Sequence, residues 1–322
     1  MSAAFFAPAS AAVAALWLAL AVDRWLGEPA VRWHPVVWMG HYLGSIGDRM
    51  APRAADAKPR DPRLFIAGAL AWSAGAMLAG ALALALQKGA AQWLPGWAAA
   101  LVLALALKPL FAWRMLRGEV LAVEAALAVS LEAGRAQLAR LVSRDVSVLS
   151  EREVRESAIE SLAENLNDSL VAPLFWFVLL GLPGAAVYRF ANTADAMWGY
   201  HGERNGRDWT WFGKWAARAD DVLSWLPARL TVWLLALAAW QWPAGVAREA
   251  RRTPSPNSGW PMAAMALLLG VRLAKPGVYA LNAEGRQAEA ADMRRAARWG
   301  GRAALALAVC ASLAIFAITR RA

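Results

Sequence analysis

Acidic and amide side chains recur every three or four residues between Glu153 and Asp168. If Ser150 opens a helix here, Ser150 and Glu153 have the form of a capping box. At ~100° per residue, one sector roughly 80° wide then holds the oxygen-bearing side chains. They are Glu153, Glu156, Glu160, Glu164 and Asn167. Carboxylates on one face repel one another unless water, a cation or basic groups neutralise them. The stripe is therefore either a solvated face, the commoner outcome, or a site for a cation and phosphate.

Two later islands combine acidic and basic residues. Arg189, Asn192 and Asp195 lie three apart, on neighbouring positions of one helical face. Arg218 precedes the pair Asp220-Asp221. Carboxylate oxygens suit Mg²⁺ and guanidinium groups suit phosphate oxygens, although a surface ion pair is the commoner use of such a dipeptide.

Two loops carry further polar residues. Ser255 and Asn257 lie in a proline-rich stretch that either binds an anion or caps the helix bundle. His34 precedes Pro35 in a loop, where a histidine more often anchors the backbone than binds a metal. With His41 and His201 as the other histidines, the sequence argues against a structural zinc site.

The elements that must position these residues are membrane helices. Of 322 residues, 59% are apolar and 18% are charged, and 19 are Trp. A span needs about 20 apolar residues, a length that about four runs approach or reach. They are Ala11 to Val22 with its lead-in from Ala3, Leu64 to Leu86, Leu94 to Trp113, and Ala303 to Ile318. Leu170 to Leu182 and Leu226 to Trp242 are shorter or interrupted by proline, which predicts one or two broken or re-entrant helices.

The predicted fold class is therefore all-α: a polytopic helical membrane protein with about four clear transmembrane helices. Arg114 to Ser143 is expected to be an amphipathic helix, within a cytoplasmic helical insertion at 114–168 of a single domain spanning 1–322. The positive-inside rule places Asp23 to Arg63 in the cytoplasm, but it does not decide the side for Arg189 to Arg229 or for Arg248 to Arg302.

Composition and motifs exclude several classes of protein. The formal charge is +10, but the Arg residues flank apolar segments and no stripe of base-stacking aromatics accompanies them. This argues against nucleic acid as a partner. A single cysteine, Cys310, excludes an intrachain disulfide. There is no Gly-x4-Gly-Lys-Ser/Thr phosphate loop and no Gly-x-Ser-x-Gly motif.

Taken together, the islands resemble the adenosylcobinamide-phosphate synthase family of cobalamin biosynthesis, the CobD/CbiB membrane proteins. The matching residues keep the family order over nearly the whole chain. They are Asp23, Gly27-Glu28-Pro29, His34-Pro35, Met39-Gly40, Arg144-Asp145, Glu160 to Glu164, Asn165, Asp168, Val171 to Phe175, Tyr188-Arg189, Asn192-Thr193, Asp195, Met197, Gly199-Tyr200, Ala217-Arg218, Asp220-Asp221, Pro227 to Arg229, Ser255 to Asn257 and Gly259 to Pro261.

The resemblance implies a multi-pass ligase of the bacterial inner membrane that uses ATP and Mg²⁺. Such enzymes join adenosylcobyric acid, a corrinoid, to aminopropanol or its phosphate, and other late enzymes of the corrinoid pathway are candidate partners beside the lipid bilayer. The expected catalytic residues are Glu160, Glu164, Asp168, Asp195 and Asp221. The expected metal ligands are Glu164, Asp168, Asp220 and Asp221. The expected substrate and phosphate ligands are Asn165, Arg189, Asn192, Arg218, Arg229, His34, Ser255 and Asn257.

Within the acidic stripe, Glu153 and Glu156 are expected to stay on the solvated face. The chain departs from the family pattern at Ser224 and Met262, where Asn and Glu are usual, so no catalytic use is expected of those positions. Two other classes remain as alternatives. A signalling protein related to modulators of β-lactamase induction predicts loss of the acidic islands, which are present. A transporter predicts an inverted repeat, and the acidic helix has no counterpart in the other half.

Overall fold

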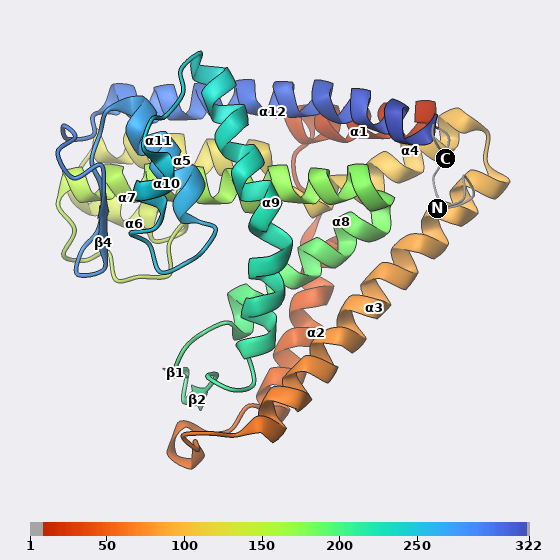
Figure 1. Ribbon diagram of the computed structural model, residues 1–322, viewed down its shortest axis with the longest axis horizontal. Helices are drawn as coiled ribbons and strands as arrows, with labels where there is room; N and C mark the ends of the chain where they lie inside the picture. Colours follow the sequence, from red (N-terminus) through yellow and green to blue (C-terminus); the bar gives the residue numbers. More distant parts are fainter. Residues whose placement is uncertain (1–8, 321–322) are drawn as a thin grey trace. The chain divides into compact units, whose positions relative to one another are not determined.

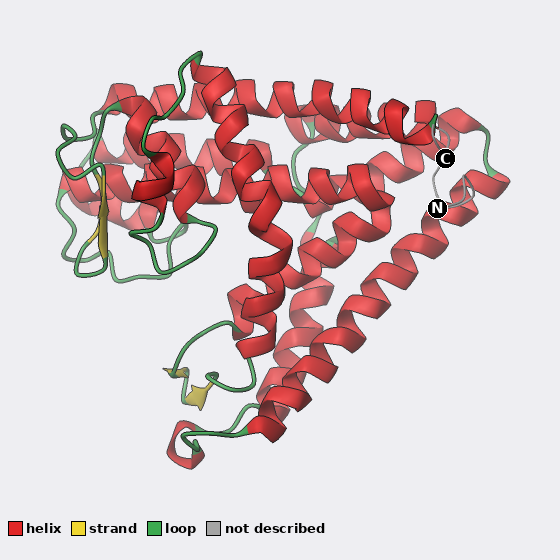
Figure 2. Ribbon diagram, in the orientation of Figure 1, coloured by secondary structure: helices red, strands yellow, loops and turns green. Residues whose placement is uncertain are grey.

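The computed structural model describes residues 9–320, and its regular structure is almost wholly helical (Figure 2). The chain forms two compact units. Unit 1 comprises the described residues up to Phe111, Ala172–Leu223 and the described residues from Ala311. Unit 2 comprises Ala112–Val171 and Ser224–Cys310.

Within residues 9–320, five helical stretches are long and apolar enough to cross a membrane. They are Pro62–Trp93, Gly96–Leu127, Glu151–Trp198, Lys214–Ala239 and Ala290–Thr319. The predicted all-α polytopic membrane fold is thereby confirmed. The first apolar run forms α1 (Ala9–Trp25), which has 17 residues, and its lead-in from Ala3 lies outside the described residues.

Unit 1 is built from helices that pack pairwise: α1 against α4, and both α2 and α3 against α8 (Figure 1). Its helices are α1, α2 (Pro35–Met50), α3 (Pro62–Trp93), α4 (Gly96–Leu107), α8 (Ala172–Trp198) and the first part of α9 (Lys214–Ala239). Its short elements are η2 (Val31–Trp33), η3 (Ala54–Asp56), η4 (Lys108–Leu110), β1 (Glu203–Arg204) and β2 (Arg207–Asp208).

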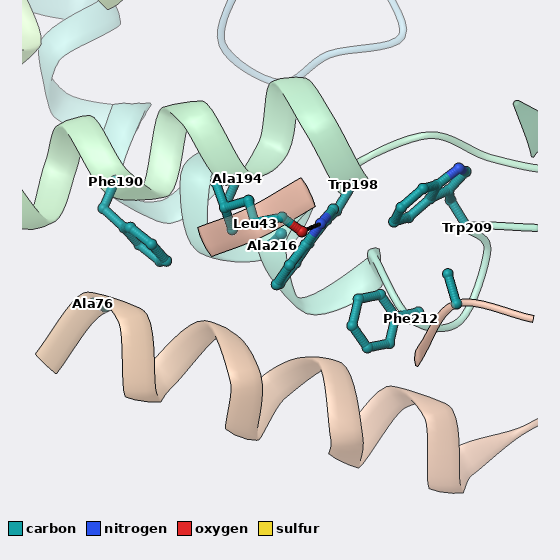
Figure 3. Close-up of a cluster of buried hydrophobic side chains, with 9 residues drawn as sticks. Leu43, Ala76, Phe190, Ala194, Trp198, Trp209, Phe212 and Ala216 are labelled. Carbon is teal, nitrogen blue, oxygen red and sulfur yellow. Dashed lines mark hydrogen bonds between the residues drawn. The ribbon is translucent and has the colours of Figure 1, made fainter. Parts of the chain in front are cut away.

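An aromatic core holds the helices of unit 1 together (Figure 3). Trp198 packs edge-on against Phe212, with ring centroids 4.9 Å apart, and its indole N–H donates to the Leu43 carbonyl at 3.1 Å. Gly75 faces the Phe190 ring so closely that a Cβ would lie 2.3 Å from it. A small residue at this position therefore permits close helix packing.

The broken helix predicted at Leu170 to Leu182 is present. α8 is interrupted at Gly181, whose φ of 68° and ψ of −159° are not helical. The amide N–H of Leu182, freed by this break, donates to the side-chain Oε1 of Gln87 on α3 at 2.8 Å. Because a lipid environment offers no water to exposed backbone groups, this buried amide side chain is what makes the break tolerable.

The interruption expected at Pro227 is absent, because α9 continues through this proline. A proline inside a helix removes the hydrogen bond to the carbonyl four residues earlier, here that of Leu223. The indole N–H of Trp176 donates to that carbonyl at 3.0 Å. A side chain from another helix thus replaces the lost backbone donor.

Unit 2 gathers shorter helices and one β-hairpin. They are α5 (Trp113–Leu127), α6 (Leu131–Leu138), α7 (Glu151–Leu166), the π-helical segment η5 (Asn167–Val171), α10 (Val246–Ala250), α11 (Gly259–Leu269), β3 (Leu273–Lys275), β4 (Tyr279–Leu281) and most of α12 (Ala290–Thr319). The single amphipathic helix expected over Arg114 to Ser143 is two helices, because Ser130 caps a new one by accepting from the Ala133 amide.

Candidate functional site

The acidic helix α7 begins as its sequence predicts. Ser150 and Glu153 form the capping box, in which Ser150 Oγ accepts from the Glu153 amide and Glu153 Oε2 accepts from the Ser150 amide. The helix runs from Glu151 to Leu166, and the chain continues through the π-helical turn η5 into α8. Such π-helical turns are rare and frequently occur at functional sites.

The expectation that Glu156 is solvated was wrong. Its side chain is completely buried and pairs with Arg152, whose Nε lies 2.8 Å from Glu156 Oε1. α7 is covered by α5, α6, α11 and β3, so little of its acidic stripe reaches solvent. Glu153 is half-buried in the capping box. Arg152, one helical turn away, pairs with Oε1, while Glu156 Oε2 is buried without a hydrogen-bond partner among the described residues.

Polar residues of α7 line a cleft of about 180 Å³ within unit 2. We call it the α7 cleft. Its polar lining residues are Ser143, Arg144, Ser157, Glu160, Ser161, Glu164, Asn165, Lys275 and Tyr279. The cleft therefore contains three residues expected from the sequence, Glu160, Glu164 and Asn165. Asn165 is held in place by donating to the Ser161 carbonyl at 3.0 Å.

Arg144 and Glu160 form the electrostatic centre of the α7 cleft. Arg144 Nη2 lies 3.1 Å from Glu160 Oε2 and also donates to Ser157 Oγ. Two atoms of this pair have no hydrogen-bond partner among the described residues, although both are buried: Arg144 Nη1 and Glu160 Oε1. An unpaired buried polar atom is costly, so this arrangement is typical of a site that a ligand completes.

Tyr279 and Lys275 reach the α7 cleft from the β3–β4 hairpin, where they are directly paired across the strands. The Tyr279 hydroxyl donates to Met262 Sδ at 3.7 Å. Burial, followed by the negative charges of Glu160 and Glu164, raises the pKa of Tyr279 above its usual value. The phenol is therefore a neutral hydrogen-bond donor at physiological pH.

Asp168 lies beyond the end of α7, in η5, and is half-buried. Asn167 donates to Asp168 Oδ1 at 2.8 Å and in turn accepts from Thr231 Oγ1 at 3.1 Å. This chain of hydrogen bonds fixes the polar side of the π-helical turn against α9 within unit 2.

Unit 1 brings together a second group of the expected residues, on α8 and α9. Asn192 Nδ2 donates to Asp220 Oδ1 at 3.5 Å, and Arg189 Nη1 donates to Asn192 Oδ1, also at 3.5 Å. Asp195 follows Asn192 by three residues on the same helix, and Asp221 follows Asp220. The Arg218 guanidinium lies over the Phe65 ring, 6.0 Å from its centroid. Both of these Asn192 hydrogen bonds are long.

Arg229 is instead occupied by protein contacts in unit 2. Its guanidinium lies between Trp225 and Trp260, 4.5 Å from each ring centroid, and donates to Asn257 Oδ1 at 2.6 Å. Ser255 Oγ accepts from the Asn257 and Ser258 amides at 3.2 Å each. These contacts describe an ordered loop clamped by an arginine, and a phosphate role for these residues stays a prediction.

His34 belongs to a buried cluster in unit 1 that we call the lysine cluster, formed by Lys108, Asp23, Glu28 and His34. Lys108 Nζ lies 2.8 Å from Glu28 Oε1 and 3.2 Å from Asp23 Oδ1, and His34 Nε2 lies 3.3 Å from Glu28 Oε2. His34 Nδ1 accepts the Val36 amide as the N-cap of α2. Burial opposes the charged form of Glu28, but the hydrogen bonds from His34 and Lys108 outweigh it and lower its pKa.

The sequence reasoning assigned no role to Arg144, Lys275, Tyr279 or Lys108. Lys108 carried a usable signal, because a lone lysine inside the apolar run Leu94 to Trp113 needs an acidic partner. Lys275 and Tyr279 carried none, because only the β3–β4 hairpin brings them to α7.

The expected metal ligands stay predictions. Among residues 9–320, no three His, Cys, Asp or Glu side chains converge so as to hold a metal ion. A magnesium ion carried by a nucleotide needs only one or two protein carboxylates, because phosphate oxygens and water complete its shell. The Asp220-Asp221 pair fits that smaller requirement.

The fold and these polar groups define an all-α polytopic membrane protein with buried charged groups in each of its two units. The family model for CobD/Cbib proteins matches residues 16–310. The chain therefore belongs to the CobD/CbiB family of cobalamin biosynthesis.

Relatives in archaea and bacteria agree. The chain is 42% identical over 282 residues to the probable cobalamin biosynthesis protein CobD of Thermococcus kodakarensis, covering 87% of this chain and 88% of that protein. It is 40% identical over 276 residues to the protein of the same name from Methanothermobacter thermautotrophicus, covering 84% and 86%. It is 38% identical over 305 residues to the cobalamin biosynthesis protein CobD of Brucella suis, covering 86% and 89%. No solved structure matches the chain.

Proposed function

We propose that this protein is an ATP-dependent ligase that joins adenosylcobyric acid to aminopropanol or its phosphate, in an inner membrane. The product is adenosylcobinamide or its phosphate. The family membership supports a step of cobalamin biosynthesis. One observation supports ligase chemistry in particular: the α7 cleft holds Glu160 and Glu164 beside Arg144 and Lys275. Glu160 Oε1 and Arg144 Nη1 are buried there without partners among the described residues.

The reaction requires an activated carboxylate. A carboxylate oxygen of adenosylcobyric acid attacks the γ-phosphorus of ATP, the bond from that phosphorus to the ADP oxygen breaks, and an acyl phosphate forms. The ammonium group of the second substrate gives up one proton to become a neutral amine. Its nitrogen then attacks the carbonyl carbon, the carbon–oxygen bond to phosphate breaks, and the nitrogen loses a second proton. That proton needs a carboxylate base within hydrogen-bond reach. We assign this role to Glu164, which lines the cleft and is only half-buried.

The nucleotide needs cations and a few carboxylates. In unit 1, Arg189 and Arg218 provide guanidinium groups for phosphate oxygens, and Asp220 and Asp221 provide one or two ligands for a nucleotide-bound Mg²⁺. The ion, when bound, neutralises charge on the transferring phosphoryl group. Asn192, which contacts both Arg189 and Asp220, orients these groups, and Asp195 lies one turn further along α8.

Purified protein in detergent or lipid nanodiscs tests the proposal. The protein is incubated with adenosylcobyric acid, ATP, Mg²⁺ and aminopropanol phosphate, and the products are identified by mass spectrometry. We expect adenosylcobinamide phosphate, ADP and inorganic phosphate, in equal amounts and only when all components are present. Folded protein that releases no product with either amine would contradict the proposed ligase.

A further inference from the structure

The α7 cleft contains both signs of charge in equal number. Arg144 and Lys275 contribute two positive charges, and Glu160 and Glu164 contribute two negative ones. A nucleotide with several phosphates is strongly anionic, so a cleft whose formal charge sums to zero is poorly matched to it. A small molecule that itself carries both signs is matched, because each of its ends finds an opposite charge.

The charges of the cleft are incompletely paired, and this indicates where a ligand's polar ends go. The Glu160 side chain is 5% exposed, and its Oε1 accepts no hydrogen bond from the described residues. Arg144 Nη1 donates none, while Nη2 is used by Glu160 and Ser157. One buried acceptor and one buried donor therefore remain to be satisfied within the same cleft.

Size limits the ligand further. The cleft volume of about 180 Å³ has room for several water molecules or for one small organic molecule. A corrin macrocycle is far larger, whereas a three-carbon amino alcohol phosphate is of the right order. Lys275 is exposed at the end of β3, next to the turn through Gly277, so it lies where a small ligand can enter.

We propose that the α7 cleft binds a small zwitterion carrying a primary ammonium group and a phosphate, and that it is the amine subsite of the ligase. Glu160 Oε1 and Glu164 bind the ammonium group, and Arg144 Nη1 and Lys275 bind the phosphate. Tyr279 donates a hydrogen bond to a phosphate oxygen, which is a far stronger acceptor than the Met262 sulfur that its hydroxyl contacts beside the Glu160 carboxylate. The identity of the zwitterion as aminopropanol phosphate rests on the proposed function.

Binding without turnover tests this subsite. Isothermal titration calorimetry of the purified full-length protein, without ATP or corrinoid, compares aminopropanol phosphate with isopropyl phosphate, which lacks the amine, and with aminopropanol, which lacks the phosphate. Because a hydrogen bond to a charged group is lost with each end, we expect both truncated ligands to bind about tenfold or more weakly than the zwitterion.

Paired substitutions assign the two ends. Lys275→Met is expected to weaken both phosphate-bearing ligands about tenfold and to leave aminopropanol unchanged. Glu164→Gln is expected to weaken both amines about tenfold and to leave isopropyl phosphate unchanged. Tyr279→Phe, which removes one hydroxyl group, should weaken only the phosphate-bearing ligands, by about threefold to tenfold. Exposed Lys88 and Glu284 provide matched controls, Lys88→Met and Glu284→Gln, which should bind all three ligands like wild type.

Other results would overturn the proposal. Equal affinity for the zwitterion, isopropyl phosphate and inorganic phosphate would make the cleft a simple anion site. If Lys275→Met and Glu164→Gln change the affinity for a non-hydrolysable ATP analogue but not the affinity for the amines, the α7 cleft is a nucleotide site. If the ligase assay yields product but the ligands do not show this binding pattern, only the proposed amine subsite is overturned. If the ligands show this binding pattern but no product forms, only the proposed ligase activity is overturned.

Discussion

Two buried groups of charges, one in each unit, differ in how completely they are paired. In the lysine cluster of unit 1, the Lys108 ammonium is shared between Asp23 and Glu28 and also donates to the Phe111 carbonyl at 3.2 Å. In the α7 cleft of unit 2, Arg144 and Glu160 meet through one nitrogen and one oxygen, and their other terminal atoms have no partner among the described residues. In the first group Lys108 and Asp23 are buried while Glu28 and His34 are half-buried, and the second group opens into a cleft.

The difference separates two uses of buried charge. A lysine surrounded by its partners connects the loop after α1, the N-terminus of α2 and the end of α4, so removing it affects the fold. The unpaired buried atoms of Arg144 and Glu160 lower the stability of the folded protein, and a bound ligand that pairs with them offsets this loss. We therefore expect substitutions in the lysine cluster to change stability, and substitutions in the α7 cleft to change binding and turnover.

Lys108→Met should produce the largest loss of stability. It leaves the buried Asp23 carboxylate and the half-buried Glu28 carboxylate without the ammonium group, and breaking a buried ion pair costs about 3–5 kcal/mol. Chemical unfolding in detergent, followed by tryptophan fluorescence, measures the change against exposed Lys88→Met. Wild-type stability in Lys108→Met would remove the distinction between the two groups.

Gln87→Leu should lower the stability less than Lys108→Met does. Gln87 is 3% exposed and accepts the Leu182 amide at the break of α8, so leucine leaves a buried backbone donor unsatisfied at about 1–3 kcal/mol. The same unfolding measurement compares it with exposed Gln287→Leu, which should be neutral. If the two variants are equally stable, the break does not depend on the glutamine side chain.

The pH dependence of stability is the finest test of the lysine cluster. The pKa of Glu28 is lowered in the folded protein, so its contribution is fully present above its unfolded value near 4.5 and is lost as the pH falls through the lower folded value. Glu28→Gln should be less stable at pH 7 and should lose less stability than wild type between pH 5 and pH 3. A parallel pH profile for the two proteins would contradict the pairing with His34 and Lys108.

Much of α7, and the shared face of Glu160 and Glu164 that makes it a candidate site, could be predicted because the signals are local. The capping box of Ser150 and Glu153 and the spacing that groups Glu160 with Glu164 depend on neighbours within one or two helical turns. The break near Pro183 was likewise signalled by glycine and proline. Composition alone indicated the polytopic all-α fold.

The errors came from contacts distant in sequence. Glu156 is buried because other elements of unit 2 cover its helix. Pro227 does not interrupt α9 because the Trp176 indole, 47 residues from Leu223 in sequence, bonds the carbonyl that the proline leaves unpaired. Lys108 donates to Glu28, from which it is separated by 80 residues in the sequence. No pattern within a single helix contains these partners.

The activity of Glu164→Gln is the decisive measurement for the proposed role of the α7 cleft. The substitution keeps the size of the side chain and removes the proposed base of the α7 cleft, so the account predicts a loss of about 10²-fold to 10⁴-fold in the rate of adenosylcobinamide phosphate formation, read by mass spectrometry. Asp221→Asn should also lose product formation, and both variants should unfold at the wild-type denaturant concentration. Glu164→Gln that is folded and fully active would contradict the assignment of the α7 cleft as the functional site.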